Sequence, residues 1–400
     1  MTKFQIILYG LLFSIAALGI DGIVPSLGLI TQGLGTTAED GSLIISAFVV
    51  GMATGEFLAG PLSDAYGRSR ILLWGLGLFA VATVGCALSD SLSSMLVMRA
   101  IQGLGAGAAS AQAALLIGDR FDLEQTARLI SSTFVVAMAV RVVTPIAGFS
   151  LSSHWGWSWL FVTFLSLTIL LIIYFRRESK LIRAPFKPRP FSLSQVQRDC
   201  RQVLADRFIQ LYIGAEIATS IGLFCYLAAA SNLMVEYVGF AQHQFSYIYA
   251  TGTALMMAAA FLNNRWVSKA GLDNMMLLTS IPLTVISIVF LLLIIWPWGN
   301  SMIVAVLMLA SLMPIIIIRI NANSGCIKRF PKAAGAASSL HNAVGLLVGA
   351  GAGAICGRIF QGTPLALAIA LMICAVLCLL CSLELRSGRK MAPHTEPKRG

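Results

Sequence analysis

Charged residues are scarce in this 400-residue chain: they make up 11% of it, whereas 58% is hydrophobic and the mean hydropathy is +0.84. An ordinary soluble domain has about 25% charged and about 45–50% apolar residues. Such a chain cannot cover a water-facing surface with polar groups. The composition therefore argues against a soluble enzyme or a nucleic-acid-binding protein, and the net charge of +11 needs another explanation.

Signatures of catalysis and metal binding are also missing. The four histidines are scattered, and the chain has no His-x-x-Glu-His set, no Gly-x-Ser-x-Gly and no phosphate-binding lysine loop. Cys374, Cys378 and Cys381 share one helix face, but the apolar run around them supplies no polar partner for a metal site. We interpret the cysteines as buried, reduced thiols, and we expect no metal, no cofactor and no enzymatic activity.

Long apolar runs dominate what is present. A membrane-spanning helix needs about 20 mostly apolar residues. The runs are apolar on most faces, unlike the short alternating strands of a membrane barrel. We therefore predict an all-α membrane protein with twelve transmembrane helices, near residues 4–30, 41–62, 71–89, 93–117, 127–151, 156–175, 208–235, 244–262, 275–296, 300–322, 333–356 and 363–383.

The basic residues lie almost entirely on one side of the predicted membrane. If both termini are cytoplasmic, 24 of the 28 Lys and Arg residues fall in cytoplasmic segments, and the remaining four are Arg99, Arg141, Arg319 and Arg358. This positive-inside bias predicts a multi-pass protein of the cytoplasmic (inner) membrane with both termini inside. It also accounts for the net charge without a nucleic-acid partner.

A polar, proline-containing stretch near the middle of the chain divides the predicted helices into two sets of six. Such a split indicates two bundles with a transport pathway between them. We predict an N-terminal six-helix bundle over residues 1–175 and a C-terminal one over 208–385. A basic cytoplasmic linker covers 176–207, with a surface helix at 192–205, and a disordered cytoplasmic tail covers 386–400.

The loop after the second span reads Gly-Pro-Leu-Ser-Asp-Ala-Tyr-Gly-Arg-Ser-Arg over residues 60–70, and the fourth span carries Arg99, Gln102 and Gly103. The fifth span carries Pro145 and Gly148. These motifs resemble those of the major facilitator superfamily. Further features are similar to the Bcr/CflA branch of drug:proton antiporters: Asp21 with Pro25, the stretch 55–64, Asp119, Gly156 with Trp157, and residues 331–340. Glu56 and Arg141 depart from the pattern of that branch.

Five ionisable residues lie well inside the predicted spans: Asp21, Glu56, Arg99, Arg141 and Glu216. A charge there costs at least about 2.5–3.5 kcal/mol unless it is paired or faces water. At about 1.5 Å per residue, Asp21, Arg99 and Arg141 share one level in the outer half of the N-terminal bundle. Glu56 lies nearer the cytoplasm and Glu216 about midway. A carboxylate beside an arginine is either a static pair or a proton switch, and both alternatives stay open.

The resemblance implies that Asp21 couples proton movement to transport and that Arg99 contributes to substrate binding. Glu216 is a second proton-coupling candidate. Arg141 either contacts an anionic substrate or pairs with Asp21. Tyr226 either lines the substrate cavity or packs in the core, as do Phe224, Tyr247 and Tyr249. Arg319, near the inner end of its span, is expected to extend its side chain towards the membrane surface.

The resemblance also implies residues that control the conformational change. Asp64 would act as a latch between the two bundles on the cytoplasmic side, with Arg68 beside it. Glycines at tight turns or helix crossings and a proline inside a span would supply the flexible points. The predicted gating residues are Gly60, Asp64, Gly67, Arg68, Pro145 and Gly148.

Three function classes follow. The first is a proton-coupled secondary exporter of small molecules that works by alternating access, similar to multidrug efflux. Because Arg99 and Arg141 outnumber Asp21 at one level, its substrate is alternatively an anionic metallophore (siderophore) or an acidic metabolite. The second class is an importer or facilitator of the same fold. The third is an intramembrane enzyme, for which no second catalytic group is evident. The predicted partners are a small-molecule substrate, protons and the lipid bilayer, and the expected state is a monomer.

Overall fold

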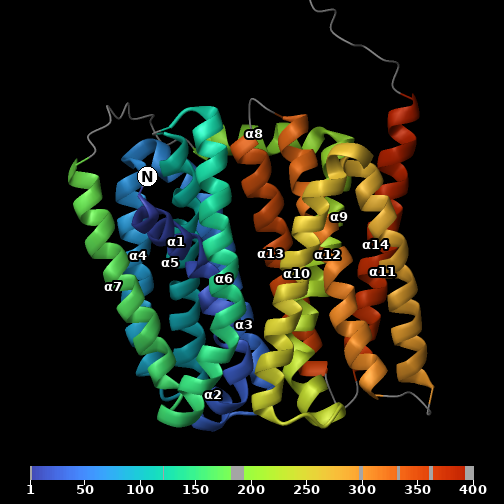
Figure 1. Cartoon of the computed structure of the whole chain (residues 1–400), viewed down its shortest axis with the longest axis horizontal. Coiled ribbons are helices and arrows are strands. Elements are labelled where there is room, and N and C mark those ends of the chain that lie inside the picture. The colour runs from blue at the N-terminus through green and yellow to red at the C-terminus, as the bar shows by residue number, and fades with distance from the viewer. Residues whose placement is uncertain are drawn as a thin grey trace, which may run out of the picture.

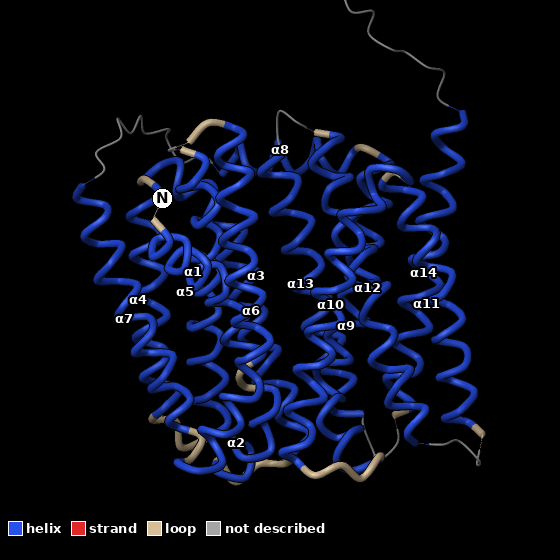
Figure 2. The backbone as a smooth tube through the Cα atoms, viewed as in Figure 1, coloured by secondary structure: helices blue, strands red, loops and turns tan. Residues whose placement is uncertain are grey.

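The computed structural model describes residues 2–119, 121–181, 193–296, 301–330, 334–359 and 364–391. Nearly all of them are helical, and within these ranges there is no strand (Figure 2). Twelve segments of this described part are long and apolar enough to cross a membrane. The prediction of twelve transmembrane helices is therefore confirmed.

The first half of the chain forms seven α-helices and two short 3₁₀ turns that pack as one group (Figure 1). In chain order they are α1 (Lys3–Asp21), η1 (Val24–Ser26), α2 (Leu27–Gly33), η2 (Ala38–Asp40), α3 (Gly41–Tyr66), α4 (Arg68–Ala87), α5 (Leu92–Gly118), α6 (Leu123–Trp155) and α7 (Ser158–Leu181). We call this group the N-terminal bundle.

The second half forms a group of similar size beside it (Figure 1). A connecting helix, α8 (Leu193–Ala205), lies across the end of the molecule where the N-terminus also lies. It is followed by α9 (Arg207–Asn232), the π-helical turn η3 (Leu233–Tyr237), α10 (Gln242–Ala270), α11 (Leu272–Ile295), α12 (Ser301–Arg329), α13 (Ala334–Ile359) and α14 (Leu365–Met391). We call α9 to α14 the C-terminal bundle.

Glycine in a left-handed conformation makes the tight turns between consecutive spans. Gly67 has φ 95° and joins α3 to α4 with no residue between the two helices apart from itself. Gly271, with φ 81°, joins α10 to α11 in the same way. Residues with a Cβ rarely adopt such angles. The backbone therefore requires glycine at both turns, and the gating role of Gly67 stays a prediction.

The structure changes several predicted boundaries. The first span is interrupted after Asp21: Gly22 caps α1, and the turn η1, which contains Pro25, precedes α2. The predicted tail was partly wrong, because α14 stays helical to Met391; residues 392–400 lie outside the described part of the chain. The predicted surface helix is present as α8, which begins at Leu193.

The two bundles meet at the end opposite to α8. Hydrogen bonds between them join Ser46 Oγ to the Ala350 carbonyl at 2.9 Å and Gln242 Nε2 to the Pro25 carbonyl at 2.9 Å. The turns η1 and η2 also pack on α10 and α13 there. All these contacts lie in the halves of α3, α10 and α13 nearest α2. The molecule is therefore closed at the α2 end, which we call the outer end, and the α8 end is the inner end.

Candidate functional site

Asp21 is the last residue of α1, and its side chain is buried. Its Oδ2 lies 2.8 Å from Nε of Arg141 on α6. Its Oδ1 accepts a hydrogen bond of 2.9 Å from the hydroxyl of Tyr249 on α10. The ring of Tyr226 stacks on Tyr249, with centroids 6.2 Å apart and an interplanar angle of 17°. These four residues, the outer site, join the two bundles.

The position of Asp21 explains its need for a partner. The C-terminal end of a helix carries partial negative charge, so a carboxylate there is disfavoured. Arg141, whose side chain is 33% exposed, supplies the compensating charge from α6. Of the two alternatives for Arg141, the structure shows the pair with Asp21. Gly22, directly after Asp21, lets the end of α1 pack closely against α6 and α7, since a Cβ there would press on Thr144 and Phe164.

Arg99 is enclosed by helices and has no exposed surface. Its guanidinium donates to the main-chain carbonyls of Gly19 at 2.7 Å and Ile44 at 3.3 Å. It also donates to Gln102 at 2.6 Å and lies 4.2 Å from the centroid of the Phe48 ring. These contacts tie α5 to α1 and α3. Substrate binding by Arg99 stays a prediction, because its described contacts are all within the bundle.

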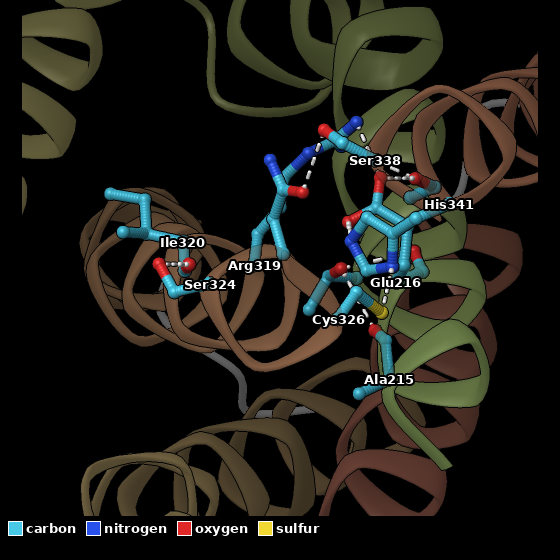
Figure 3. A network of polar contacts seen from close by, with 11 residues as sticks. Ala215, Glu216, Arg319, Ile320, Ser324, Cys326, Ser338 and His341 are labelled. Carbon is cyan, nitrogen blue, oxygen red and sulfur yellow. Dashed lines mark hydrogen bonds and ion pairs between the residues drawn. The ribbon is translucent and has the colours of Figure 1, made fainter. Parts of the chain in front are cut away.

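A second charged cluster lies in the C-terminal bundle. Glu216 on α9 is fully buried, and its Oε1 lies 2.6 Å from a guanidinium nitrogen of Arg319 on α12. Its Oε2 lies 3.3 Å from Nε2 of His341 on α13. Ser220 bridges the pair: it donates to Glu216 Oε1 and accepts from Arg319, each at 3.2 Å. Figure 3 shows these groups converging from three helices, and we call them the inner site.

The expectation for Arg319 was wrong, because its side chain points to Glu216 and is only 18% exposed. The physical reason is that the buried carboxylate of Glu216 would have no arginine beside it if Arg319 extended to the membrane surface. Glu216 lies nine residues from the inner end of α9, and Arg319 lies ten from that of α12. At 1.5 Å per residue both are roughly 14–15 Å deep. Ionisable side chains inside a membrane pair with one another, so Arg319 compensates the charge of Glu216 instead of extending to the membrane surface.

Glu56 on α3 faces the inner site from the opposite bundle. It is half-buried, and the charges of Arg319 and Glu216 act on it. Among the described hydrogen bonds and ion pairs, none involves Glu56. A second carboxylate, on the other bundle, therefore lies within electrostatic range of the inner site.

The predicted gating residues are distributed over both ends. At the inner end Asp64 is exposed, and the described ion pair of Arg68 is with Asp119 at 2.8 Å rather than with Asp64. Gly60 has open space where a Cβ would be. Pro145 lies inside α6, and Gly148 lets α6 approach the Gly22 carbonyl closely. Their roles in gating stay predictions.

Two residues of these sites were misjudged from the sequence. Tyr249 was only one of several aromatic candidates, and its register on α10 is what brings it to Asp21. His341 was dismissed as one of four scattered histidines. It carried a usable signal, since a histidine inside an apolar span is an ionisable group in lipid, like the five residues that were singled out.

Comparison with known proteins decides the family. A sequence profile of the Major Facilitator Superfamily matches residues 9–354. The chain belongs to this superfamily. It is 25% identical over 393 residues to the bicyclomycin resistance protein homolog of Haemophilus influenzae, covering 95% of both chains. It is 27% identical over 264 residues to the multidrug resistance protein MdtL of Klebsiella pneumoniae, covering 65% of this chain and 66% of that one.

Solved structures of superfamily transporters share the fold. The chain resembles a D-xylose-proton symporter with a TM-score of 0.72 and 15% identity, covering 96% of both chains. It resembles an auto-inhibited POT family peptide transporter with a TM-score of 0.73 and 14% identity, covering 99% and 98%. The resemblance to the Bcr/CflA branch is confirmed by the relatives, and the protein is a multi-pass membrane transporter rather than an enzyme.

Proposed function

We propose that this superfamily member is a proton-coupled exporter of small, drug-like molecules that works by alternating access of its two bundles. The names of its relatives, which refer to bicyclomycin and multidrug resistance, support efflux. The distribution of Lys and Arg supports cytoplasmic termini in the inner membrane, so that the inner end faces the cytoplasm. With this orientation the end at which Ser46 and Gln242 bond the two bundles together faces away from the cytoplasm, and we infer that the structure is the cytoplasm-facing conformation.

The observation that carries the proposal is the hydrogen bond from Tyr249 to Asp21 at 2.9 Å. It crosses from one bundle to the other at the outer end, whereas the Arg141–Asp21 pair lies within one bundle. Opening the outer end must therefore separate Tyr249 from Asp21 and leave the Arg141 pair in place. A donor to a carboxylate favours its charged form, so losing that donor favours protonation.

The link between opening of the outer end and protonation of Asp21 would make inward proton movement drive outward substrate movement. When the outer end is open, Asp21 has lost one donor and takes up a proton from outside. When the outer end closes again, Tyr249 returns and favours proton release to the cytoplasm. A substrate that leaves outside in exchange completes one antiport cycle. Import driven by the same residues would need substrate and proton to bind together, and nothing at the outer site favours that.

The alternative of an anionic substrate has less support from Arg99 and Arg141 than the sequence suggested. Arg141 is neutralised by Asp21, and Arg99 has no surface for a ligand in this conformation. The alternative is kept as an outcome of the test.

The test uses everted membrane vesicles, in which the cytoplasmic face is outside. A pH gradient, acidic inside, should drive uptake of bicyclomycin, and Asp21→Asn should abolish it. A parallel comparison of spent medium, with and without the protein under iron-limited growth, tests the metallophore alternative. Loss of an anionic metal-binding compound from the medium would replace the drug-efflux proposal. Gradient-driven uptake that is unchanged in the Asp21 variant would remove that residue from the mechanism.

A further inference from the structure

The N-terminal bundle has an apolar groove between α1, α6 and α7. Its volume is about 450 Å³, and its twelve lining residues all come from these three helices. Leu18 of α1 and Gly148 of α6 are buried at its floor. Ala139 and Ala147 of α6 and Thr163 of α7 are exposed at its rim. The groove is therefore open along one side.

The open side of the groove is continuous with the surface that faces the lipid. α6 and α7 present large, exposed apolar side chains along it, among them Val143, Val162 and Ile169. Figure 1 shows α7 at the edge of the N-terminal bundle that lies away from the C-terminal bundle. Arg141 uses a different face of α6 to reach Asp21. The groove therefore belongs to the surface in contact with the bilayer and not to the pathway between the bundles.

The groove spans the depth of one membrane leaflet. Along α6 its lining runs from Ala139 to Leu151, roughly 18 Å at 1.5 Å per residue. The hydrocarbon core of a bilayer is about 30 Å thick, and one leaflet supplies half of it. Leu151 lies one turn before exposed Trp155, and Leu160 directly follows exposed Trp159; the two indole rings are 5.3 Å apart. Because such tryptophans lie at the headgroup level, the groove begins just beneath the headgroups at the outer end.

The lining of the groove is suited to a hydrocarbon. Among the described residues that line it, none is charged, and its two threonine hydroxyls donate to carbonyls of their own helices. Thr144 donates to Val140 at 2.6 Å, and Thr163 donates to Trp159 at 3.0 Å. A pocket for a drug-like ligand normally offers a few convergent polar groups that fix its orientation. A chain that enters from the bilayer needs none, because it binds through van der Waals contact with the walls.

We propose that the groove binds one acyl chain of a phospholipid from the leaflet at the outer end. The headgroup lies beside Trp155 and Trp159, and the chain runs along α6 and fills the space between α6 and α7. This lipid site is separate from the proton and substrate sites, and it does not depend on the direction of transport.

The bound chain would support the backbone next to Asp21. A Cβ at Gly22, the residue after Asp21, would meet Thr144 and Phe164 of the groove. A Cβ at Gly148 of the groove would meet the carbonyl of Gly22. Groove residues thus pack directly on the end of α1. A chain that contacts them from the membrane side holds α1, α6 and α7 together, so it should stabilise the folded bundle.

The experiment uses the full-length protein in nanodiscs that contain phosphatidylethanolamine with a photoactivatable diazirine. One probe carries the diazirine near the carboxyl end of the acyl chain, and the other carries it near the methyl end. Peptide mass spectrometry after irradiation locates the labelled residues. Ala147→Phe and Ala139→Phe fill the two ends of the groove from exposed positions. Ala258→Phe, at an exposed alanine of α10 outside the groove, is the matched control.

We expect the carboxyl-end probe to label the groove near Leu151 and the methyl-end probe to label it near Ala139. Labelling should fall about tenfold in both groove variants, a loss of about 1.4 kcal/mol in binding, and stay unchanged in the control. Equal labelling of the groove and of the exposed surface of α11 would indicate contact with bulk lipid only and would overturn the site. The reverse order of the two probes would place the chain in the other leaflet and would contradict the proposal.

Thermal unfolding in detergent tests the stabilisation separately. A ligand that binds only the folded state raises the melting temperature. Added phosphatidylethanolamine should raise it for the wild type and for Ala258→Phe, and should raise it less for Ala147→Phe, whose side chain already occupies the groove. An equal rise in all three proteins would refute a stabilising chain in the groove. Loss of the groove label from the wild type on adding bicyclomycin would assign the groove to a substrate and overturn the lipid assignment.

Discussion

In the N-terminal bundle the buried carboxylate of Asp21 pairs with an arginine on the fifth transmembrane helix, whereas in the C-terminal bundle that of Glu216 pairs with an arginine on the fourth. The two halves of this superfamily are structural repeats, so the two carboxylates lie on corresponding helices and the two arginines do not. The first, fourth and fifth helices of each bundle carry three of its buried or partly buried ionisable residues: Asp21, Arg99 and Arg141 in one, and Glu216, Arg319 and His341 in the other.

The depth of each carboxylate explains the different pairing. Asp21 is at the end of α1, level with Arg141. Its second oxygen accepts a hydrogen bond from Tyr249 at the outer end. Glu216 is nearer the inner end, level with Arg319 and opposite Glu56. One carboxylate is thus bonded across the bundles at the closed outer end, and the other lies nearer the inner end and is paired within its own bundle. The first helix of each bundle therefore carries a buried carboxylate, but the two carboxylates lie towards opposite ends of the molecule.

The largest difference between the bundles should appear on removing the arginine. Arg319→Ala leaves Glu216 buried without its counter-charge, and breaking such a pair costs about 3–5 kcal/mol. Arg141→Ala should cost less than half of that, because its side chain is partly exposed and Asp21 keeps Tyr249. Chemical denaturation in detergent, followed by circular dichroism, measures both. A greater loss for the Arg141 variant would reverse the comparison.

Transport should depend more on the outer carboxylate than on any surface acid. Asp21→Asn should lower proton-driven transport about 100-fold, a loss of about 2.7 kcal/mol in the coupled step, and change substrate affinity less than threefold. Uptake and equilibrium binding in vesicles measure the two quantities. Asp90→Asn, at an exposed position in the loop between α4 and α5, is the control and should behave as wild type. Loss of binding in the Asp21 variant would instead make that residue part of the substrate site.

The bond between the bundles should be weakened selectively by Tyr249→Phe. A hydrogen bond to a charged group contributes about 1.5–3 kcal/mol, so its loss should favour opening of the outer end. Hydrogen exchange at the outer ends of α1 and α10 should then increase. Tyr226→Phe is the matched control, because it keeps the stacked ring and has no described bond to Asp21. Equal exchange in the two variants would mean that the Tyr249 hydroxyl does not hold the outer end.

Helix packing should tolerate less change in the N-terminal bundle. A Cβ at Gly103 would overlap the main-chain carbonyl of Phe48, where α5 crosses α3. At Gly252 on α10 of the C-terminal bundle, it would meet Leu312 Cδ1 at 3.1 Å and Leu309 Cδ2 at 3.2 Å, which are side-chain atoms that can move. Gly103→Ala should therefore cost about 1–3 kcal/mol, and Gly252→Ala less. Thermal unfolding of both variants measures the difference, and equal melting temperatures would contradict it.

Much of the fold could be predicted from the sequence, because hydropathy alone identifies the spans. The pair of Asp21 with Arg141 was one of two stated alternatives, since both residues fell at one depth. The pair of Glu216 with Arg319 was missed although the same arithmetic applies. Depth gives the level of a side chain but not the direction in which it points around the helix axis. That direction depends on packing between helices that are far apart in the sequence, and it also brought Tyr249 to Asp21.

The measurement that tests the central claim most directly is the outer-end distance as a function of pH. Spin labels at Thr37 and His243, both exposed at the outer end, report whether the bundles have separated there. In the wild type, lowering the pH should increase the separated fraction, because protonation of Asp21 is linked to loss of the Tyr249 contact. In Asp21→Asn the separated fraction should already be high at pH 8 and should change less with pH. A variant that titrates like the wild type would show that Asp21 does not couple proton binding to opening.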